Sequence, residues 1–221
     1  MNVYVDFDGT IAPADPTDAL FDRFADPAWR QIEERWQQGR LASRDCMQAQ
    51  VEMLRATPAA IDAFLDTVEI DPHFPGFVRL CHRHGLRVAV VSDGLDRIVG
   101  PVLERAGLNL PFFANQLEWL GGDRWTLRFP YARPDCRVNM GNCKCGHRRP
   151  NATADIMVGD GRSDFCIASR CRLVLSKGAL TRHCQTAGLP HRPIGDFADA
   201  TRLLAAWLRQ PTPIEARASA G

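Results

Sequence analysis

Four stretches of the chain are apolar without alternation, which is typical of strands buried on both faces of a parallel sheet. They are rich in Val, Ile and Leu and read NVYVD (2–6), LRVAVVSD (86–93), ADIMVGD (154–160) and RLVLS (172–176). Helical stripes separate them, as in residues 95–107, where Gly107 is a typical helix end. Strands that alternate with helices predict an open α/β fold.

The segment between the first two expected strands differs in kind. From about residue 14 to residue 72 it carries helical stripes and no strand signal. Asp26-Pro27, Ser43 and Thr57-Pro58 each open a stripe, which predicts three helices; we take the Trp and Met side chains along them, such as Trp29, Trp36 and Met47, as core. We expect a small helical bundle inserted directly after the first strand.

These patterns divide the chain. We expect an α/β core of residues 1–13 and 73–210, a helical insert of residues 14–72 and a disordered tail of residues 211–221, rich in Pro, Ala and Ser. Within the core, QLEWL (116–120) and RWTLRF (124–129) alternate around Gly-Gly-Asp, which is a hairpin signature.

Composition and charge exclude several classes of protein. With 221 residues and a formal net charge of +1, nothing favours a nucleic-acid partner. No apolar run approaches a membrane span, and the N-terminus lacks the pattern of a secretory signal. We therefore expect a cytoplasmic protein, a monomer or homodimer, that keeps its eight cysteines reduced.

Polar signatures follow three of the four strands. Each could be an ordinary turn, but ligands collect at the carboxyl ends of strands in such sheets. The residues concerned are Asp6 with Asp8, then Ser92-Asp93-Gly94, then Asp160 with Asp164, together with Lys144 in the Gly-rich stretch GNCKCG.

Phosphoryl transfer uses this set of groups. Asp6, Asp160 and a backbone carbonyl near Asp8 could bind a hard dication. One carboxylate can attack phosphorus while its neighbour handles protons. Ser92 and Lys144 suit phosphate oxygens.

In order and spacing, DFDGT (6–10), VVSDG (90–94), Lys144 and GDGRSD (159–164) resemble the four motifs of haloacid dehalogenase-like (HAD) phosphatases. The resemblance implies a three-layer Rossmannoid α/β core with a parallel sheet and a helical, C1-type cap. It also implies an aspartyl-phosphate intermediate and Mg²⁺ as cofactor. It makes Asp6 the nucleophile and Asp8 the general acid/base. The other implied roles are phosphate binding by Ser92, Asp93, Gly94 and Lys144, magnesium ligation by Asp6, Asp8 and Asp160, and support from Asp164.

Finer resemblance is to the phosphoserine phosphatase-like branch. GDGRSDFCIASRCRLVLSKGALTRHC (159–184) and SRDCMQAQVEML (43–54) resemble the 2-hydroxy-3-keto-5-methylthiopentenyl-1-phosphate phosphatases, the MtnX-like group. Gln50 stands where phosphoserine phosphatases carry an arginine for the substrate carboxylate, which counts against phosphoserine. We take Asp15, Asp18, Arg44 and Gln50 as candidates for substrate choice.

Cys136, Cys143, Cys145 and His147 leave two interpretations open. They could bind zinc, although the spacing is unusual, or they could be thiols lining the phosphate loop whose oxidation disturbs Lys144. Among the histidines, His73 and His147 lie nearest the expected site.

The sequence therefore predicts a magnesium-dependent phosphatase for a small phosphorylated metabolite. A phosphoserine phosphatase or a phosphotransferase on the same fold is the nearest alternative. A non-catalytic binding protein that retains the fold is the alternative of another class.

Overall fold

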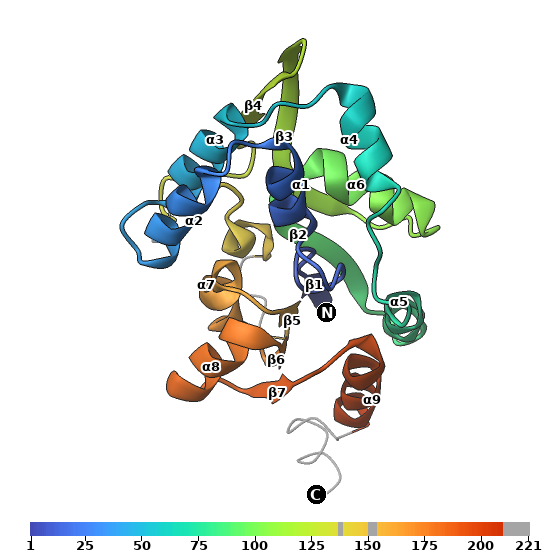
Figure 1. Ribbon diagram of the computed structural model, residues 1–221. Helices are drawn as coiled ribbons and strands as arrows, with labels where there is room; N and C mark the ends of the chain where they lie inside the picture. Colours follow the sequence, from blue (N-terminus) through green and yellow to red (C-terminus); the bar gives the residue numbers. More distant parts are fainter. Residues whose placement is uncertain (137–138, 150–153, 210–221) are drawn as a thin grey trace, which may run out of the picture.

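A central sheet organises the computed structural model, which describes residues 1–136, 139–149 and 154–209 (Figure 1). In these residues the sheet has seven strands in the order β4-β3-β2-β1-β5-β6-β7. Their bounds are β1 (Asn2–Val5), β2 (Arg87–Leu95), β3 (Phe112–Gly121), β4 (Arg124–Arg128), β5 (Ile156–Gly159), β6 (Leu173–Ser176) and β7 (His191–Pro193). Adjacent strands are parallel except β3 and β4, which form the expected hairpin.

The four apolar stretches are confirmed as β1, β2, β5 and β6. Two features of the sheet were not expected. The first residues of β3 continue the parallel sheet beside β2 before the chain turns into the hairpin. β7 is a short edge strand that contains a proline. It has no apolar pattern from which a strand could be predicted.

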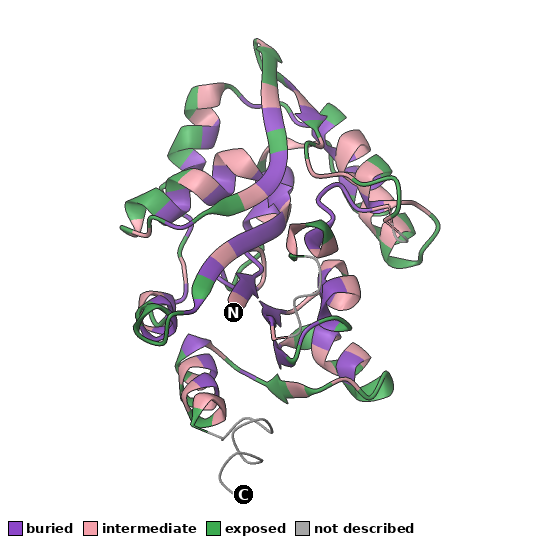
Figure 2. Ribbon diagram, turned by 180° about the vertical axis from the view of Figure 1, so that it is seen from behind, coloured by how far each residue is buried: buried purple, intermediate pink, exposed green. Residues whose placement is uncertain are grey.

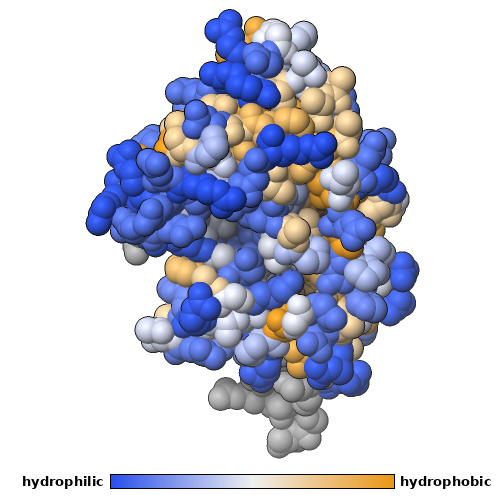
Figure 3. Space-filling model, viewed as in Figure 1, coloured by the Kyte–Doolittle hydropathy of each residue, from blue (hydrophilic) through white to orange (hydrophobic). Residues whose placement is uncertain are grey.

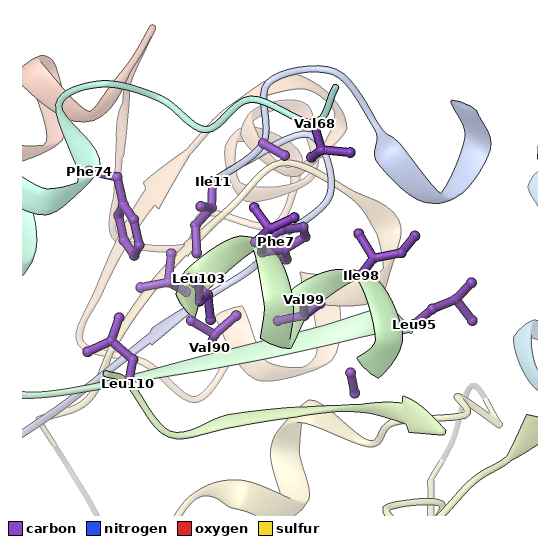
Figure 4. Packing of buried hydrophobic residues seen from close by; sticks show 14 of the residues in the cluster. Phe7, Ile11, Val68, Phe74, Val90, Leu95, Ile98, Val99, Leu103 and Leu110 are labelled. Atoms are coloured by element: carbon purple, nitrogen blue, oxygen red, sulfur yellow. The ribbon is translucent and has the colours of Figure 1, made fainter. Parts of the chain in front are cut away.

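Helices cover both faces of the sheet, which gives the three-layer α/β architecture. α7 (Phe165–Ala168) and α8 (Gly178–Thr186) pack on one face, where their apolar residues join Tyr4 and Met157. α5 (Phe74–Arg83), α6 (Asp96–Arg105) and α9 (Phe197–Leu208) cover the other. Figure 2 shows the strands buried between these layers. In Figure 4, Phe7 and Val90 face Val99 and Leu103 of α6.

Four helices lie between β1 and α5: α1 (Pro16–Phe24), α2 (Trp29–Gln37), α3 (Ser43–Glu52) and α4 (Pro58–Leu65). α1 was not among the three expected helices. The hydroxyl of Thr57 caps α4 as expected, accepting from the backbone N–H of Ala60 at 3.2 Å. Ser43 does not cap α3, because Ala42 holds that position and the Ser43 hydroxyl donates to Asp93 instead.

The apolar core continues from the sheet into these helices. Phe21, Trp29, Val51 and Ile61 belong to the same buried cluster as the strand residue Val5. The β3–β4 hairpin holds the far side of this region, since the indole N–H of Trp125 donates to the carbonyl of Ala56 at 2.8 Å. In Figure 1 the hairpin stands beside α3, far from β7.

Two further short elements approach the site: the 3₁₀ turns η1 (Lys144–His147) and η2 (Arg162–Asp164). Among the described residues, no helix combines the length and apolar character needed to cross a membrane. The expected tail, 211–221, lies outside the described residues. The division into a core and an insert at residues 13 and 72 stays a prediction.

Phe197 anchors α9 to α5. Its ring centroid lies 4.7 Å from that of Phe74 and 5.2 Å from that of Phe77, and the side chain is fully buried. We expect Phe197→Ala to lower the free energy of unfolding by about 3–5 kcal/mol, because it leaves a cavity between two helices. Urea unfolding measures the loss. Leu120→Ala, at an exposed hairpin position, is the control and should change stability little.

Candidate active site

The carboxyl ends of β1, β2 and β5 meet at one edge of the sheet, because β1 lies between the other two strands and all three are parallel. A cavity of about 150 Å³ opens there, lined on one side by Asp6, Asp8 and Asp160 and on the other by residues of α1, α2 and α3. In Figure 3 the surface is notched between α2 and the α7–α8 side. The structure thus brings the expected polar residues to one place.

Lys144 lies buried at the centre of this edge. Its Nζ is 2.7 Å from Oδ1 of Asp6 and 2.7 Å from Oδ1 of Asp164, and all three side chains are almost fully enclosed. Burial alone lowers the pKa of Lys144, but attraction to Asp164 and Asp6 outweighs it and holds this pKa above its ordinary value. The lysine is therefore permanently charged.

Three carboxylates crowd around that single lysine. Asp6, Asp160 and Asp164 each offer an oxygen, and these oxygens lie within 4.8 Å of one another. Burial, followed by the charge of Asp164, raises the pKa of Asp6 well above its usual value and that of Asp160 to about 6. One lysine cannot balance three carboxylates. Oxygen donors with uncompensated negative charge fit a hard divalent cation such as Mg²⁺.

The carboxylate of Asp8 lies apart from these three. Its Oδ1 accepts from the hydroxyl of Thr17 at 2.9 Å, and its Oδ2 accepts from the hydroxyl of Ser92 at 2.9 Å. Gly94 donates its backbone N–H to Ser92 at 2.8 Å. Sequence reasoning missed Thr17, which stands in the first turn of α1 without any motif around it. Metal binding at Asp8 stays a prediction, and the atom predicted to bind the metal is a backbone carbonyl oxygen, not the carboxylate.

Asp93 joins three segments. Its carboxylate accepts from the Ser43 hydroxyl at 2.5 Å, from the Asn142 backbone N–H at 2.7 Å and from the Asn115 side chain at 3.3 Å. Burial raises the pKa of Asp93, and these donors oppose that rise. The carboxylate is thus used in tying α3 and the Lys144 loop to the end of β2. Phosphate binding by Asp93 stays a prediction and would use its backbone N–H.

Asn142 fastens the loop that carries Lys144. Its amide donates to the carbonyls of Ser92 and Phe113, both at 2.8 Å, and its Oδ1 lies 2.6 Å from Nε2 of His147. Burial, and then the charge of Lys144, lowers the pKa of His147 to about 4, so the ring is neutral and Nε2–H donates to Asn142.

Of the two interpretations of the cysteine cluster, zinc binding together with His147 finds no support in the described residues. The His147 ring stacks on Phe113 with centroids 4.3 Å apart and meets Tyr131 edge-on. In the described part of the chain, the thiols of Cys136, Cys143 and Cys145 do not join it in a group of metal-ligand spacing. The other flagged histidine, His73, is exposed at the start of α5 and does not line the cavity.

Two glycines let carboxylates approach the backbone closely. A Cβ on Gly9, which has φ of +71°, would lie 2.6 Å from Oδ2 of Asp160. A Cβ on Gly94 would lie 2.5 Å from Oδ2 of Asp8 and 2.8 Å from the Thr17 hydroxyl. The packing of the site therefore requires both glycines, and at Gly9 the positive φ favours glycine as well.

The far wall of the cavity is acidic. Asp15, Asp18 and Gln50 line it as expected, but Arg44 does not. Gln50 is buried, and its amide donates to Glu33 at 3.0 Å. Burial, and then the charge of Glu33, raises the pKa of Asp18 to about 7. The sequence analysis did not identify Glu33 as a site residue, because a glutamate in a polar helix has the same pattern as a solvent-exposed one.

Two apolar residues expected in the core line this wall. Trp36 and Met47 are only partly buried; Met47 also packs against the core cluster, as expected, whereas Trp36 does not belong to it. Their helical spacing could not separate a core stripe from a pocket stripe, because both face inward from the helix.

A sequence profile of haloacid dehalogenase-like hydrolases matches residues 3–169. The chain belongs to this family. A 2-hydroxy-3-keto-5-methylthiopentenyl-1-phosphate phosphatase of Geobacillus kaustophilus is 31% identical over 209 residues, covering 89% of this chain and 92% of the relative. One from Exiguobacterium is 30% identical, covering 90% and 94%. The expectations of a HAD-family phosphatase enzyme and of similarity to the MtnX-like group are confirmed.

Solved structures show the same hydrolase fold. A substrate-bound phosphoserine phosphatase superposes with a TM-score of 0.67 at 18% identity, covering 91% of this chain and 97% of the other. A phosphoserine phosphohydrolase-like protein from Francisella tularensis gives 0.68 at 17%, covering 91% and 98%. At these identities the likeness establishes the fold of this hydrolase and leaves its substrate open.

The close approach at Gly94 gives a test of the site geometry. We expect Gly94→Ala to reduce kcat/KM of this hydrolase toward p-nitrophenyl phosphate by at least about 10-fold, because the new methyl group displaces Asp8. Steady-state kinetics measure the loss, and circular dichroism checks the fold. Gly76→Ala, where the new Cβ finds its nearest atom at 3.7 Å, is the matched control; equal activity of both variants would contradict the geometry.

Proposed function

We propose that the protein hydrolyses a small phosphomonoester through an aspartyl-phosphate on Asp6, in a magnesium-dependent reaction. The observation that supports this most is the buried placement of Asp6 against Lys144. Oδ1 of Asp6 is occupied by Lys144 at 2.7 Å and by the N–H of Phe7 at 2.8 Å. Its other oxygen, Oδ2, is then the one that attacks phosphorus.

Asp8 handles the protons. As Asp6 bonds to phosphorus, the bond to the leaving oxygen breaks and Asp8 gives that oxygen its proton. Asp8 then takes a proton from the water that attacks the phosphoryl group, which releases phosphate and restores Asp6. The Ser92 hydroxyl, which donates to Asp8, can turn to a phosphate oxygen. Lys144 offsets the negative charge that spreads over the phosphoryl oxygens.

Asp6, Asp160 and the backbone carbonyl of Asp8 are the proposed magnesium ligands. Bound Mg²⁺ would offset the charge of the carboxylates and of the phosphate. Asp164 acts behind them as a positioning residue. Its Oδ2 accepts from the backbone N–H groups of Asp160 and Gly161 at 3.1 and 3.2 Å, while its Oδ1 holds Lys144. It thereby fixes both the loop of Asp160 and the lysine.

Loss of the nucleophile tests this mechanism. We expect Asp6→Asn to reduce turnover of p-nitrophenyl phosphate by at least about 1,000-fold, because an amide does not attack phosphorus. Removing Mg²⁺ with a chelator should abolish turnover reversibly. The exposed Asp66→Asn is the control. Full activity of Asp6→Asn would refute the mechanism, and phosphate appearing on an added alcohol instead of in solution would identify a phosphotransferase.

The helical insert, residues 14–72, is proposed as the cap that selects the substrate. Its wall presents Asp18 and Glu33 beside the apolar faces of Trp36 and Met47. Gln50, buried against Glu33, offers no guanidinium to a substrate carboxylate. A phosphomonoester whose organic part is uncharged and has an apolar end therefore suits the wall better than phosphoserine does. The named activity of the curated relatives is consistent with this class of substrate.

A comparison of two substrates tests the wall. We expect kcat/KM for phosphoserine to be at least about 10-fold below that for an alkyl phosphate whose organic part carries no charge. The reason is that Glu33 repels the carboxylate of phosphoserine. Glu33→Gln should narrow the ratio by raising kcat/KM for phosphoserine alone. Glu34→Gln, the exposed neighbour in α2, should leave it unchanged. Phosphoserine as the better substrate of the unmodified protein would overturn the assignment.

A further inference from the structure

Four cysteines line a second cavity, of about 270 Å³, that shares no lining residue with the catalytic one. Two of them, Cys143 and Cys145, flank the active-site lysine, and Cys166 follows Asp164 by two positions. The fourth is Cys136. The cavity therefore lies against the two segments that hold the buried Lys144–Asp164 ion pair.

The sulfur atoms approach one another in pairs. Sγ of Cys145 lies 2.9 Å from Sγ of Cys166, about 0.9 Å more than a disulfide bond length of ~2.05 Å. Cys136 and Cys143 form a second neighbouring pair. Three thiols of a metal site would have to gather around one point, and in the described residues the group with that spacing is the carboxylate cluster instead. Pairing favours a disulfide over a thiolate metal site.

Cationic side chains surround the thiols. The cavity is also lined by Arg133, Arg148, Arg149 and Arg170. Asp135 is the acid among its lining residues and is paired with Arg133 at 2.9 Å, and Arg148 is paired with Asp155 at 3.2 Å, so Arg149 and Arg170 contribute most to the positive charge of the cavity. An anionic ligand that contains a disulfide bond could bind the arginine side chains and react with the thiols in the same cavity.

We propose that Cys145 and Cys166 form a reversible disulfide by exchange with an anionic low-molecular-weight disulfide, a peptide disulfide bearing carboxylates, and that this bond lowers the activity of the enzyme. The disulfide stands on the thiol geometry alone, whereas the loss of activity rests on the function proposed above. The reduced thiols of Cys145 and Cys166 take no part in catalysis in this scheme, since neither lines the catalytic cavity.

The exchange is balanced in two steps. A thiolate of the pair attacks one sulfur of the low-molecular-weight disulfide, forming a mixed disulfide and releasing one thiol. The second cysteine then attacks the protein-side sulfur and releases the second thiol. The two cysteine sulfurs lose two electrons in all, the small disulfide gains them, and the two cysteine protons end on the released thiols.

The bond reaches the active site through two short segments. Cys145 lies in η1 next to Lys144, and Cys166 lies in α7 directly after the η2 turn of Asp164. Bringing the sulfurs to bonding distance shifts one or both segments, while Lys144 makes 2.7 Å contacts to Asp6 and Asp164. Displacement of a catalytic group by about 1 Å can cost two orders of magnitude in rate. We expect kcat to fall at least about 10-fold.

The full chain is incubated with oxidised glutathione at pH 8.5 and compared with protein kept in a reductant. We expect the number of titratable thiols under denaturing conditions to fall from eight to six and the intact mass to fall by about 2 Da. A cross-linked peptide should join residues 145 and 166. The kcat for p-nitrophenyl phosphate should drop and return on reduction.

Variants separate the pair from its neighbours. Cys145→Ser and Cys166→Ser should each prevent the cross-link and keep the activity under oxidant, whereas Cys136→Ser, in the same cavity, should behave like the unmodified protein. Eight free thiols after incubation, a cross-link between Cys136 and Cys143, or zinc that co-purifies and protects the thiols would each overturn the proposal. A cross-link without loss of activity would overturn its regulatory part. If the reduced protein is inactive, the proposed function is refuted. The thiol count and the cross-linked peptide then still decide whether the disulfide forms.

Discussion

The site depends on one buried ion pair network, in which Lys144 lies between Asp6 and Asp164. Removing one partner from such a network typically costs about 3–5 kcal/mol, because an uncompensated charge stays buried. The network also joins three segments that are far apart in the sequence. β1 supplies Asp6, η1 supplies the lysine, and the turn after β5 supplies Asp164. The carboxylate of Asp6, the charge of Lys144 beside it and the loop of Asp160 are thus fixed by the same contacts.

A second set of contacts joins the helical insert to this network. Asp93 accepts from Ser43 at the start of α3 and from Asn142, two residues before Lys144. The start of α3, which belongs to the far wall of the cavity, and the loop of Lys144 are therefore held through one carboxylate. In this protein, a short hydrogen-bond path couples the position of α3 to the geometry of the Lys144 loop.

Proteins with the same fold as this chain are named for different substrates. Relatives about 30% identical are named for one substrate, while structures below 20% identical with the same fold are named for another. In this chain the cluster of Asp6, Lys144 and Asp164 lies at strand ends and in the short turns beside them. The far wall is built from side chains of α1, α2 and α3, among them Glu33 and Gln50.

The chain alone determined the α/β class, the four central strands and the residues at their carboxyl ends, because buried strands and turn glycines leave local patterns. It could not determine which partners those residues take. Thr17 and Glu33 lie in unremarkable polar stretches, and Asn142 stands in the Gly-rich stretch of Lys144 without a pattern that assigns it a partner. All three matter because folding places them against Asp8, Gln50 and His147. The same limit applies to Ser43, which looked like a helix cap and instead bonds Asp93, and to Trp36, which looked like core and lines the cavity. Local periodicity reports which face of a helix turns inward, and only the tertiary structure decides whether that face meets a core, a carboxylate or a substrate.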